Sequence, residues 1–265
     1  MTTTYALALS DDELARYQMM AEMAADDERE DWAAAGITTG ACVADVGCGP
    51  GAMLAVLAAA VGPNGAALGV DRDPQAVHHA RDAIAAFPHA AVHTGDAHLS
   101  GLPVGVFDVA MCRHVLAHNG GREQVIVAHL AALVRPGGAV YLVDVDLSGA
   151  GLFPPPPGLD IDDHYRAFHA RRGGDLRVGL RLGALLEDAG LVVERYRSLA
   201  KVMRVPAGMR GPQWAAREAM VAEGVATRAD LARWDAAYDR MDDAEDRPWF
   251  FIPAFVAVGR RPLVG

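Results

Sequence analysis

A glycine-rich turn near residue 47 places the strongest constraint on how this chain can fold. It follows a short apolar segment, residues 43–46, and precedes residues 51–61, which are rich in alanine and leucine. Its glycines, Gly47, Gly49 and Gly51, can adopt positive φ and leave the backbone open to close approach by another molecule. Such a turn after a buried strand predicts a ligand crevice at the carboxyl end of the first strand of an open α/β sheet.

Apolar segments and helix-forming segments alternate through the first 145 residues. Four further strands are predicted at residues 66–70, 90–94, 106–112 and 139–145, and the helices between strands at residues 51–61, 73–87 and 123–134. The strand segments are continuously apolar, which is typical of strands buried on both faces. The order of elements therefore predicts a doubly wound α/β fold, with a mainly parallel sheet between two layers of helices.

The second half of the chain alternates less regularly. Four consecutive prolines at residues 154–157 predict a stiff, extended connector. Helices are predicted at residues 160–172, 180–189 and 212–243, and strands at residues 191–197 and 249–258. Residues 249–258 are expected to form a single, final strand.

Helical segments outside the alternating region predict a lid. A capping-box sequence at residues 10–13 begins an N-terminal helix, and residues 1–36 are expected to form a helical lid. Residues 37–265 are expected to form one ligand-binding domain. That domain carries predicted helical insertions near residues 150–178 and 208–245.

The charge and cysteine content argue against several classes of partner. The formal net charge of −10 disfavours a nucleic-acid backbone or an anionic membrane as the main partner. The three cysteines have neither paired spacing nor an even number, so a disulfide framework or zinc site is not expected. The first ten residues lack the basic segment of a signal peptide, and the longest apolar run, residues 52–61, is too short to span a bilayer. We expect a cytoplasmic monomer or homodimer.

The glycine turn alone is compatible with two classes of cofactor, the dinucleotides and other cofactors that contain adenosine. Gly47, Gly49 and Ala52 also satisfy the dinucleotide pattern G-x-G-x-x-G/A. Asp71 ends the second strand, where its carboxylate can accept both hydroxyls of a ribose in either class. Asp96 follows the third strand, where it can accept a hydrogen bond from an exocyclic adenine amine. Both acids therefore predict a ligand that contains adenosine.

Several sequence blocks occur in the order found in one enzyme family. They are Asp45 with Gly47, Gly49 and Gly51, then Asp71, Gly95-Asp96, Phe107-Asp108 and the Arg-Pro-Gly-Gly sequence at residues 135–138. This order, over residues 41–145, resembles the class I S-adenosyl-L-methionine (SAM)-dependent methyltransferases, most closely those of the ubiquinone/menaquinone-biosynthesis type. The resemblance implies a Rossmann-like, seven-stranded sheet whose last strand is antiparallel. It also implies SAM as cofactor, with S-adenosyl-L-homocysteine as product.

The resemblance assigns roles to individual positions around the cofactor. The residues that would hold the methionine part of SAM are Asp45, Gly47, Cys48 and Gly49, with Arg113 beside them. Asp71 would bind the ribose, while Arg72 would flank the adenine and Asp96 and Ala97 would contact it. Tyr17, on the N-terminal helix, would close over the cofactor.

The methyl acceptor is expected beyond the fourth and fifth strands. Because SAM carries an activated methyl group, alignment of the reactants and exclusion of water can supply much of the acceleration. A general base is added when the acceptor is a hydroxyl or an acidic carbon. The candidates for a base or an acceptor-orienting residue are His114, Asp144, His164 and His169. Ordinary packing or capping is the alternative role for each of them.

His114 and His118 also have the spacing of metal ligands on one face of a helix. No glutamate follows the first histidine, and the segment continues with Asn119, Gly120 and Gly121, which break helices. The sequence therefore predicts no metal site here.

These observations predict SAM-dependent methyl transfer to the oxygen, nitrogen or carbon of a small, fairly apolar molecule. An NAD(P)-dependent oxidoreductase in the same crevice is the first alternative, although the chain has no Tyr-x-x-x-Lys pair and its single lysine is Lys201. A protein that binds SAM without transferring its methyl group, or that acts as a cyclase, is the second alternative.

Overall fold

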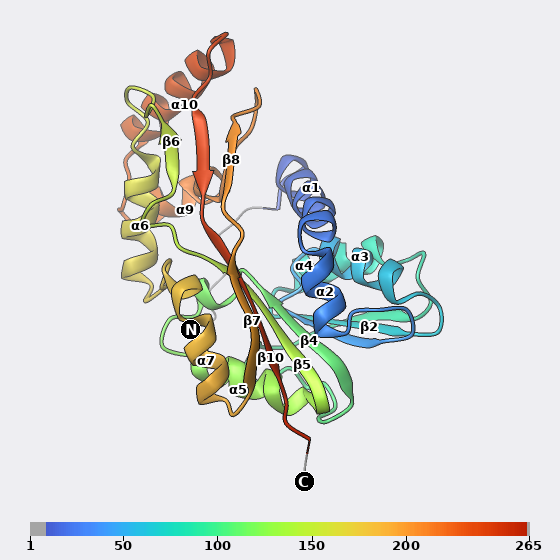
Figure 1. Ribbon diagram of the computed structural model, residues 1–265. Helices are drawn as coiled ribbons and strands as arrows, with labels where there is room; N and C mark the ends of the chain where they lie inside the picture. The colour runs from blue at the N-terminus through green and yellow to red at the C-terminus, as the bar shows by residue number, and fades with distance from the viewer. Residues whose placement is uncertain (1–8, 264–265) are drawn as a thin grey trace.

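The chain folds around a seven-stranded sheet (Figure 1). The computed structural model describes residues 9–263, so the start of the predicted lid and most of the segment used to exclude a signal peptide lie outside the described residues. In order across the sheet, the strands are β3 (Ala90–Thr94), β2 (Ala66–Asp71), β1 (Cys42–Val46), β4 (Phe107–Arg113), β5 (Val134–Val145), β10 (Ala254–Arg260) and β7 (Val192–Ser198). The predicted seven-stranded sheet is confirmed.

The last strand, β10, runs antiparallel to its two neighbours in the sheet. β10 pairs antiparallel with both β5 and β7, whereas β1, β2, β3, β4 and β5 form parallel pairs. The predicted antiparallel last strand is therefore confirmed. Because the other strands are parallel, β1, β2, β4 and β5 all end at the same edge of the sheet. The glycine turn follows β1 at this edge.

Helices cover both faces of the sheet and enclose two apolar cores. One face carries α2 (Arg29–Ala35), α3 (Ala52–Val61) and α4 (Pro74–Ala83), and the other carries α5 (Glu123–Leu133) and α7 (Leu182–Asp188). On the first face, Leu54, Leu57 and Met111 are fully buried. On the second, Ile126 and Leu130 are fully buried. This arrangement explains the continuous apolar runs of the central strands, since each strand must fill both cores.

The N-terminal helix begins as predicted, but only one of the two hydrogen bonds of a capping box is present among the described residues. α1 (Asp11–Asp27) starts at Ser10, whose side chain accepts a hydrogen bond from the Glu13 amide at 3.3 Å. The Glu13 carboxylate binds the guanidinium of Arg16 with distances of 2.5 and 2.7 Å. The acid is thus used within the first turns of the helix, where it neutralises the Arg16 charge.

A second sheet, which the sequence interpretation did not predict, builds part of the cap. Its strands are β6 (Gly151–Phe153), β9 (Trp249–Ile252) and β8 (Lys201–Arg204), all antiparallel. The prediction of one unbroken strand over residues 249–258 is wrong. Pro253, which has no amide hydrogen to donate to a ladder, separates β9 from β10 and allows the two halves to join different sheets.

Both predicted insertions contain helices, and these pack on the second sheet. They are α6 (Ile161–Arg171), α8 (Pro212–Ala215), α9 (Arg217–Ala222) and α10 (Arg228–Asp243). Phe168, Met220 and Trp234 are buried together between them. Two short 3-10 helices, η1 (Leu116–His118) and η2 (Val178–Arg181), join this part to the main sheet. We call the second sheet with α6, α8, α9 and α10 the cap.

The cap stands at the edge of the main sheet where β5 and β7 end and β10 begins. Figure 1 shows α1 and the cap on either side of this edge, with β8 facing α1. The carboxyl ends of the parallel strands thus lie between these two parts. Within residues 9–263, no helix is both long and apolar enough to cross a membrane.

Candidate functional site

The glycine turn between β1 and α3 is held against β2 and against the loop after β4. The amides of Gly47 and Cys48 both donate to the Val70 carbonyl, at 2.7 and 3.0 Å. Gly47 has φ of 82°, and a Cβ placed on it would lie 2.3 Å from the Val115 side chain. The absence of a side chain at Gly47 therefore lets the loop after β4 pack directly on the turn.

The other two glycines of the turn have different environments. Gly51 has φ of 86°, and a Cβ on it would lie 2.6 Å from the Ala80 backbone, so it is required for the packing of α3 on α4. Gly49 has φ of 54°, and a Cβ there would meet no described atom within 4 Å. The backbone at Gly49 is thus bordered by open space, which a ligand can enter.

Asp45, the last acid of β1, has a buried carboxylate with an unused oxygen. Its side chain is 2% exposed, and its Oδ2 has no hydrogen-bond partner among the described residues. Burial raises the pKa of Asp45 to about 7, although the nearby Arg113 guanidinium acts in the opposite direction. An unpaired buried carboxylate is costly. Its unused oxygen fits a ligand that brings a hydrogen-bond donor or an ammonium group to the turn.

Asp71 connects the end of β2 to the glycine turn. One oxygen accepts the Gly49 amide and the other accepts the Asp73 amide, both at 2.9 Å. Burial raises its pKa, and the same two amides oppose the rise. Arg72 is exposed beside it, and Cys48 is buried within the turn. The predicted residues Asp45, Gly47, Cys48, Gly49 and Asp71 therefore lie in one place.

The third acid, Asp96, lies in a tight turn after β3. It accepts the His98 amide at 3.3 Å and also contacts the His98 imidazole. Burial would raise the pKa of Asp96, but the hydrogen bonds from His98 outweigh this and lower it. Ala97 is half-buried between these two residues. His98 was not predicted, and its place two residues after the acid is the signal that could have identified it.

Arg113, at the end of β4, belongs to a buried ion-pair network. Its guanidinium donates to both oxygens of Glu28, at 2.5 and 3.0 Å, and the Tyr141 hydroxyl donates to the same carboxylate at 2.7 Å. Glu28 lies between α1 and α2 and is 3% exposed. The Arg113 charge also acts on the pKa of Asp45. Arg113 therefore links the predicted lid to the glycine turn, a connection that the sequence did not reveal.

The N-terminal helix also reaches the loop after β4. Tyr17 is half-buried on α1, with the Arg16 guanidinium 5.0 Å from its ring centre. The charge of Arg16 acts on the pKa of His114 and of Tyr165. Arg16 of α1 is therefore close enough to act on groups of the loop after β4 and of α6.

His114 has an unusual backbone conformation for its residue type. Its φ is 53°, and its amide donates to the Val143 carbonyl at 2.8 Å. Burial and the charges of Arg113 and Arg16 lower the pKa of His114 to about 3. The imidazole is therefore neutral at neutral pH, where it can donate or accept a hydrogen bond but is a weak base.

Three further rings meet beside this loop, and we call them the His–Tyr cluster: His118, Tyr165 and His169. The His118 and His169 ring centres are 4.9 Å apart, and those of Tyr165 and His169 are 4.5 Å apart. Tyr165 and His169 are 4% and 5% exposed. Burial, with nearby arginine charges, lowers the pKa of His118 to about 4 and that of His169 to about 3. His118 and Tyr165 thus join the predicted His169.

Besides His114, two of the predicted catalytic residues, Asp144 and His164, lie outside the cluster. Asp144, 1% exposed, accepts the amides of Ala117 and Val145 at 3.1 and 2.9 Å. Burial raises the pKa of Asp144 to about 7. Its contacts fix the start of η1, as expected for a positioning residue. His164 contacts the Asp160 carbonyl at 3.1 Å, and its ring centre lies 5.1 Å from that of Trp234, inside the cap.

The later sequence blocks have structural roles at the opposite edge of the sheet. Arg135 donates to Asp108 at 2.7 Å, and the other Asp108 oxygen accepts the Cys42 amide at 2.7 Å. A Cβ on Gly138 would lie 2.9 Å from the Asp108 carbonyl oxygen. These contacts connect the starts of β1, β4 and β5. They do not border the glycine turn, which follows the other end of β1.

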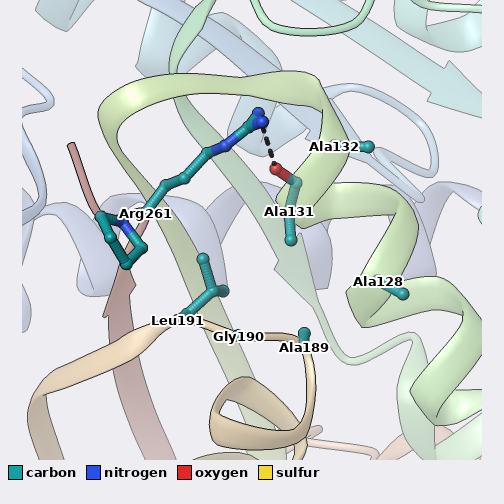
Figure 2. Close-up of a pocket in the computed structure, with 8 residues that line it drawn as sticks. Ala128, Ala131, Ala132, Ala189, Gly190, Leu191 and Arg261 are labelled. Atoms are coloured by element: carbon teal, nitrogen blue, oxygen red, sulfur yellow. Dashed lines mark hydrogen bonds between the residues drawn. The ribbon is translucent and has the colours of Figure 1, made fainter. Parts of the chain in front are cut away.

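The hollow in Figure 2 also lies at that opposite edge. It has a volume of about 320 Å³ and is lined mainly by alanines of α5, by the turn before β7 and by Arg261. The Arg261 guanidinium donates to the carbonyls of Ala131 and Val134 at 3.4 and 2.6 Å. The one charged side chain in its lining is therefore already hydrogen-bonded within the protein, and the hollow offers no reactive group.

Within residues 9–263, no three His, Cys, Asp or Glu side chains are arranged to hold a metal ion.

Two comparisons concern the sequence. Residues 43–138 match the model of a family described as a methyltransferase domain. An uncharacterised 37.1 kDa protein in a transposon of Streptomyces fradiae is 31% identical over 161 residues, which are 60% of this chain and 46% of that protein. The chain thus spans about half the length of this curated relative.

Solved structures with the same fold include several methyltransferases. A SAM-dependent methyltransferase from Aquifex aeolicus is 15% identical, with a TM-score of 0.54 over 93% of this chain and 97% of its own. The YcgJ protein from Bacillus subtilis is 19% identical, with a TM-score of 0.56 over 91% and 99%. The geranyl diphosphate C-methyltransferase from Streptomyces coelicolor is 12% identical, with a TM-score of 0.54 over 92% and 78%. At such low identities the similarity is one of fold.

Proposed function

Because the chain carries a methyltransferase domain within the class I SAM-dependent fold, we propose that it transfers the methyl group of SAM to a small, fairly apolar acceptor. The domain match and the sheet topology confirm the family predicted from the sequence blocks, and with it the cofactor SAM. The ubiquinone/menaquinone subtype stays a prediction.

The observation that carries this proposal is the unused Asp45 oxygen beside the open backbone of Gly49. A buried carboxylate without a partner is stabilised when a ligand supplies a positive donor. The amino group of SAM is such a donor, so Asp45 and the turn would hold its methionine part, with Gly47, Cys48 and Gly49 as the cradle. Arg113 would act on this end by fixing the charge around Asp45.

The acids at the ends of β2 and β3 would hold the nucleoside of SAM. Asp71 already accepts the Gly49 amide, so a ribose bound to its carboxylate would be held directly against the turn. Asp96 and Ala97 would contact the adenine, and the exposed Arg72 would flank it. Tyr17 would close over the cofactor from α1.

The chemistry requires mainly alignment and the exclusion of water. SAM, when bound, supplies an activated methyl group, so the protein need only hold the acceptor in line with it. His114 lies next to Val115, which packs against Gly47, and is therefore well placed to orient an acceptor at the turn. Its lowered pKa favours orientation over proton removal. The cap and α1 would enclose the acceptor.

The proposed acceptor is a small molecule, and nucleic acids and membranes are not proposed partners. A geranyl diphosphate methyltransferase shares the fold, which is one example of a small-molecule acceptor in this architecture. The three cysteines are free, in keeping with the proposed cytoplasmic location. We propose a monomer or homodimer.

Isothermal titration calorimetry with SAM, S-adenosylhomocysteine and NADPH tests the cofactor assignment. We expect binding of the two adenosyl ligands and none of NADPH. Asp71→Ala should weaken their binding at least tenfold, because it removes the ribose acceptor and releases the Gly49 amide. Asp82→Ala, an exposed change on α4, is the matched control and should have no effect.

Binding of NADPH without any response to SAM would favour the oxidoreductase alternative and overturn the proposal. Methyl transfer is tested separately by a screen of small-molecule acceptors with labelled SAM. Tight SAM binding without transfer to any acceptor would favour a SAM-binding protein or a cyclase.

A further inference from the structure

The polar atoms of the His–Tyr cluster are unpartnered, yet they are not sealed from solvent. No hydrogen bond joins the His118 or His169 imidazole, or the Tyr165 hydroxyl, to residues 9–263. None of their atoms is among the buried polar atoms without a partner in that range. These atoms must therefore border accessible space, although Tyr165 and His169 are at least 95% buried as residues. Buried polar groups normally find partners, so these face a place where a ligand can supply one.

Backbone contacts join the cluster to the loop that packs on the proposed cofactor turn. A Cβ on Gly120 would lie 1.4 Å from the Gly173 carbonyl oxygen, so the loop after β4 and the end of α6 are in close backbone contact. The Asp175 amide also donates to the Ala117 carbonyl at 3.0 Å. Since the same loop packs on Gly47 through Val115, the rings and the turn form one continuous unit.

Positive charge surrounds this space from several elements. The arginines whose charges act on the rings are Arg16 of α1, Arg72 after β2 and Arg172 after α6. Arg172 is also paired with Glu223. The acidic residues whose charges act on the pKa of Tyr165 are Glu13 of α1 and Asp144 of β5. Glu13 is paired with Arg16, and Asp144 accepts backbone amides. Arg72 forms no ion pair within the described part of the chain.

This environment offers hydrogen-bond donors but no strong base. A neutral imidazole and a tyrosine hydroxyl each have one hydrogen to donate. An acceptor that reacts as a neutral hydroxyl would need its proton removed. An acceptor that is already an anion needs only donors and nearby positive charge.

We propose that the His–Tyr cluster is the acceptor subsite, and that it binds the anionic oxygen of a small molecule carrying a carboxylate or an acidic phenol. This inference rests on the proposed methyltransferase function. The anionic oxygen supplies the electron pair for the new bond to the methyl carbon. The bond from that carbon to sulfur breaks with its pair on sulfur, which becomes neutral, and no proton has to be removed.

Binding of simple probes in the presence of S-adenosylhomocysteine tests the subsite. The probes are benzoate and 4-nitrophenolate, which separate the two anion sources, with benzyl alcohol and benzylamine as neutral and cationic counterparts. We expect at least one anion to bind tenfold or more tightly than the alcohol and the amine. Titrations followed by protein-observed NMR measure affinities in the weak range expected for such small probes.

Two variants separate the cluster from the rest of the cap. Tyr165→Phe removes one hydroxyl that makes no described hydrogen bond, so the fold should be kept, and anion binding should weaken about tenfold. Ala167→Ser, an exposed change on the same helix, should leave anion binding within twofold of the wild type. Equal affinity for anion and alcohol, no measurable anion binding, or an unchanged Tyr165→Phe variant would overturn the subsite. The binding of S-adenosylhomocysteine is measured separately, so its failure points to the proposed function instead.

Discussion

Asp45 makes the folded chain less stable at neutral pH, and we propose that its carboxylate is placed there to bind a ligand. Its carboxyl is 2% exposed, and burial raises its pKa to about 7. In the unfolded chain the pKa of an aspartate is about 3.9. Between these values the folded state holds a proton that the unfolded state has lost. The free energy of unfolding therefore falls as pH rises from about 4 to 7, and stays lower above pH 7.

Asp45→Asn removes this titration while keeping the shape of the side chain. We expect the free energy of unfolding of the variant to exceed that of the wild type by about 4 kcal/mol at pH 8, at about 1.4 kcal/mol per unit of pKa difference, and by little at pH 4. Its affinity for S-adenosylhomocysteine should fall at least tenfold. Denaturant unfolding at the two pH values and calorimetry measure both quantities. The pKa of Asp144 is also raised to about 7. The free energy of unfolding of the variant therefore still falls with rising pH because of Asp144.

The matched control is Asp82→Asn, in which an exposed carboxyl is changed. It should alter neither the pH dependence nor the affinity. A variant at Asp45 that is less stable than the wild type at pH 8 would contradict the assigned titration. Normal affinity in that variant would contradict the role of the carboxylate in binding.

Residues that serve the site through local backbone geometry could be predicted from the sequence. Asp45 and Asp71 lie at the ends of β1 and β2, Gly47 follows β1, and parallel strands bring such ends to one edge. Glu28 could not be predicted, because its partner Arg113 is 85 residues away in the chain. Such pairings depend on how α1 and α2 pack on the sheet, which no local pattern encodes.

At the scale of elements, Glu28 joins the N-terminal helices to the central sheet. It carries the only carboxylate that Arg113 contacts within residues 9–263, and it also accepts the Tyr141 hydroxyl. Glu28→Gln removes the carboxylate that pairs directly with the buried guanidinium. We expect a loss of about 3 kcal/mol in the free energy of unfolding, measured by denaturant titration.

Glu30→Gln is the control for this change, because the Glu30 side chain on α2 is 89% exposed. It should alter stability by less than about 0.5 kcal/mol. An equally small effect of Glu28→Gln would show that the buried ion pair does not hold the helices in place.

Gly120 tests the contact between the loop after β4 and the end of α6. A Cβ there would lie 1.4 Å from the Gly173 carbonyl oxygen, so Gly120→Ala must separate the two segments. We expect the amides of Gly174 and Asp175 to lose protection from hydrogen exchange, because their hydrogen bonds to His169 and Ala117 depend on this contact. Gly120→Ala should also weaken the binding of the anionic probes.

Gly149→Ala is the control, since a Cβ there would come no closer than 3.9 Å to another atom. It carries the same change in chain entropy without the clash. Protection at Gly174 and Asp175 that survives Gly120→Ala would mean that the two segments can separate without disturbing the cluster.

The elements of the main sheet were predictable because the apolar periodicity of each segment and the turn residues beside it indicate the same helix or strand. The cap was only partly predictable. Its helices have long segments with a clear pattern, but β6 has three residues and β8 has four, which is too short for a periodic signal. Pro253 was the available clue, since a proline inside an apolar run argues against a single central strand.

At the scale of the whole molecule, the main sheet and the cap have separate apolar cores. The cores on the two faces of the sheet surround residues such as Leu57 and Leu130, whereas the cap encloses Phe168 and Trp234. A crevice between two such units can close over an acceptor if the units keep their own structure. Local stability should therefore differ between them.

Trp234→Ala tests whether the cap is a cooperative unit of its own. Trp234 is fully buried and its indole donates to Asp160 at 2.7 Å, so its loss should cost the cap about 3–5 kcal/mol. We expect faster hydrogen exchange in β6, β8 and β9, with β1 and β4 unchanged and S-adenosylhomocysteine still bound. Trp249→Ala changes a residue of β9 that is 45% exposed, and it should change hydrogen exchange little. Equal acceleration in β1 would show that the sheet and the cap unfold as one, in which case closure over the acceptor cannot come from independent movement of the cap.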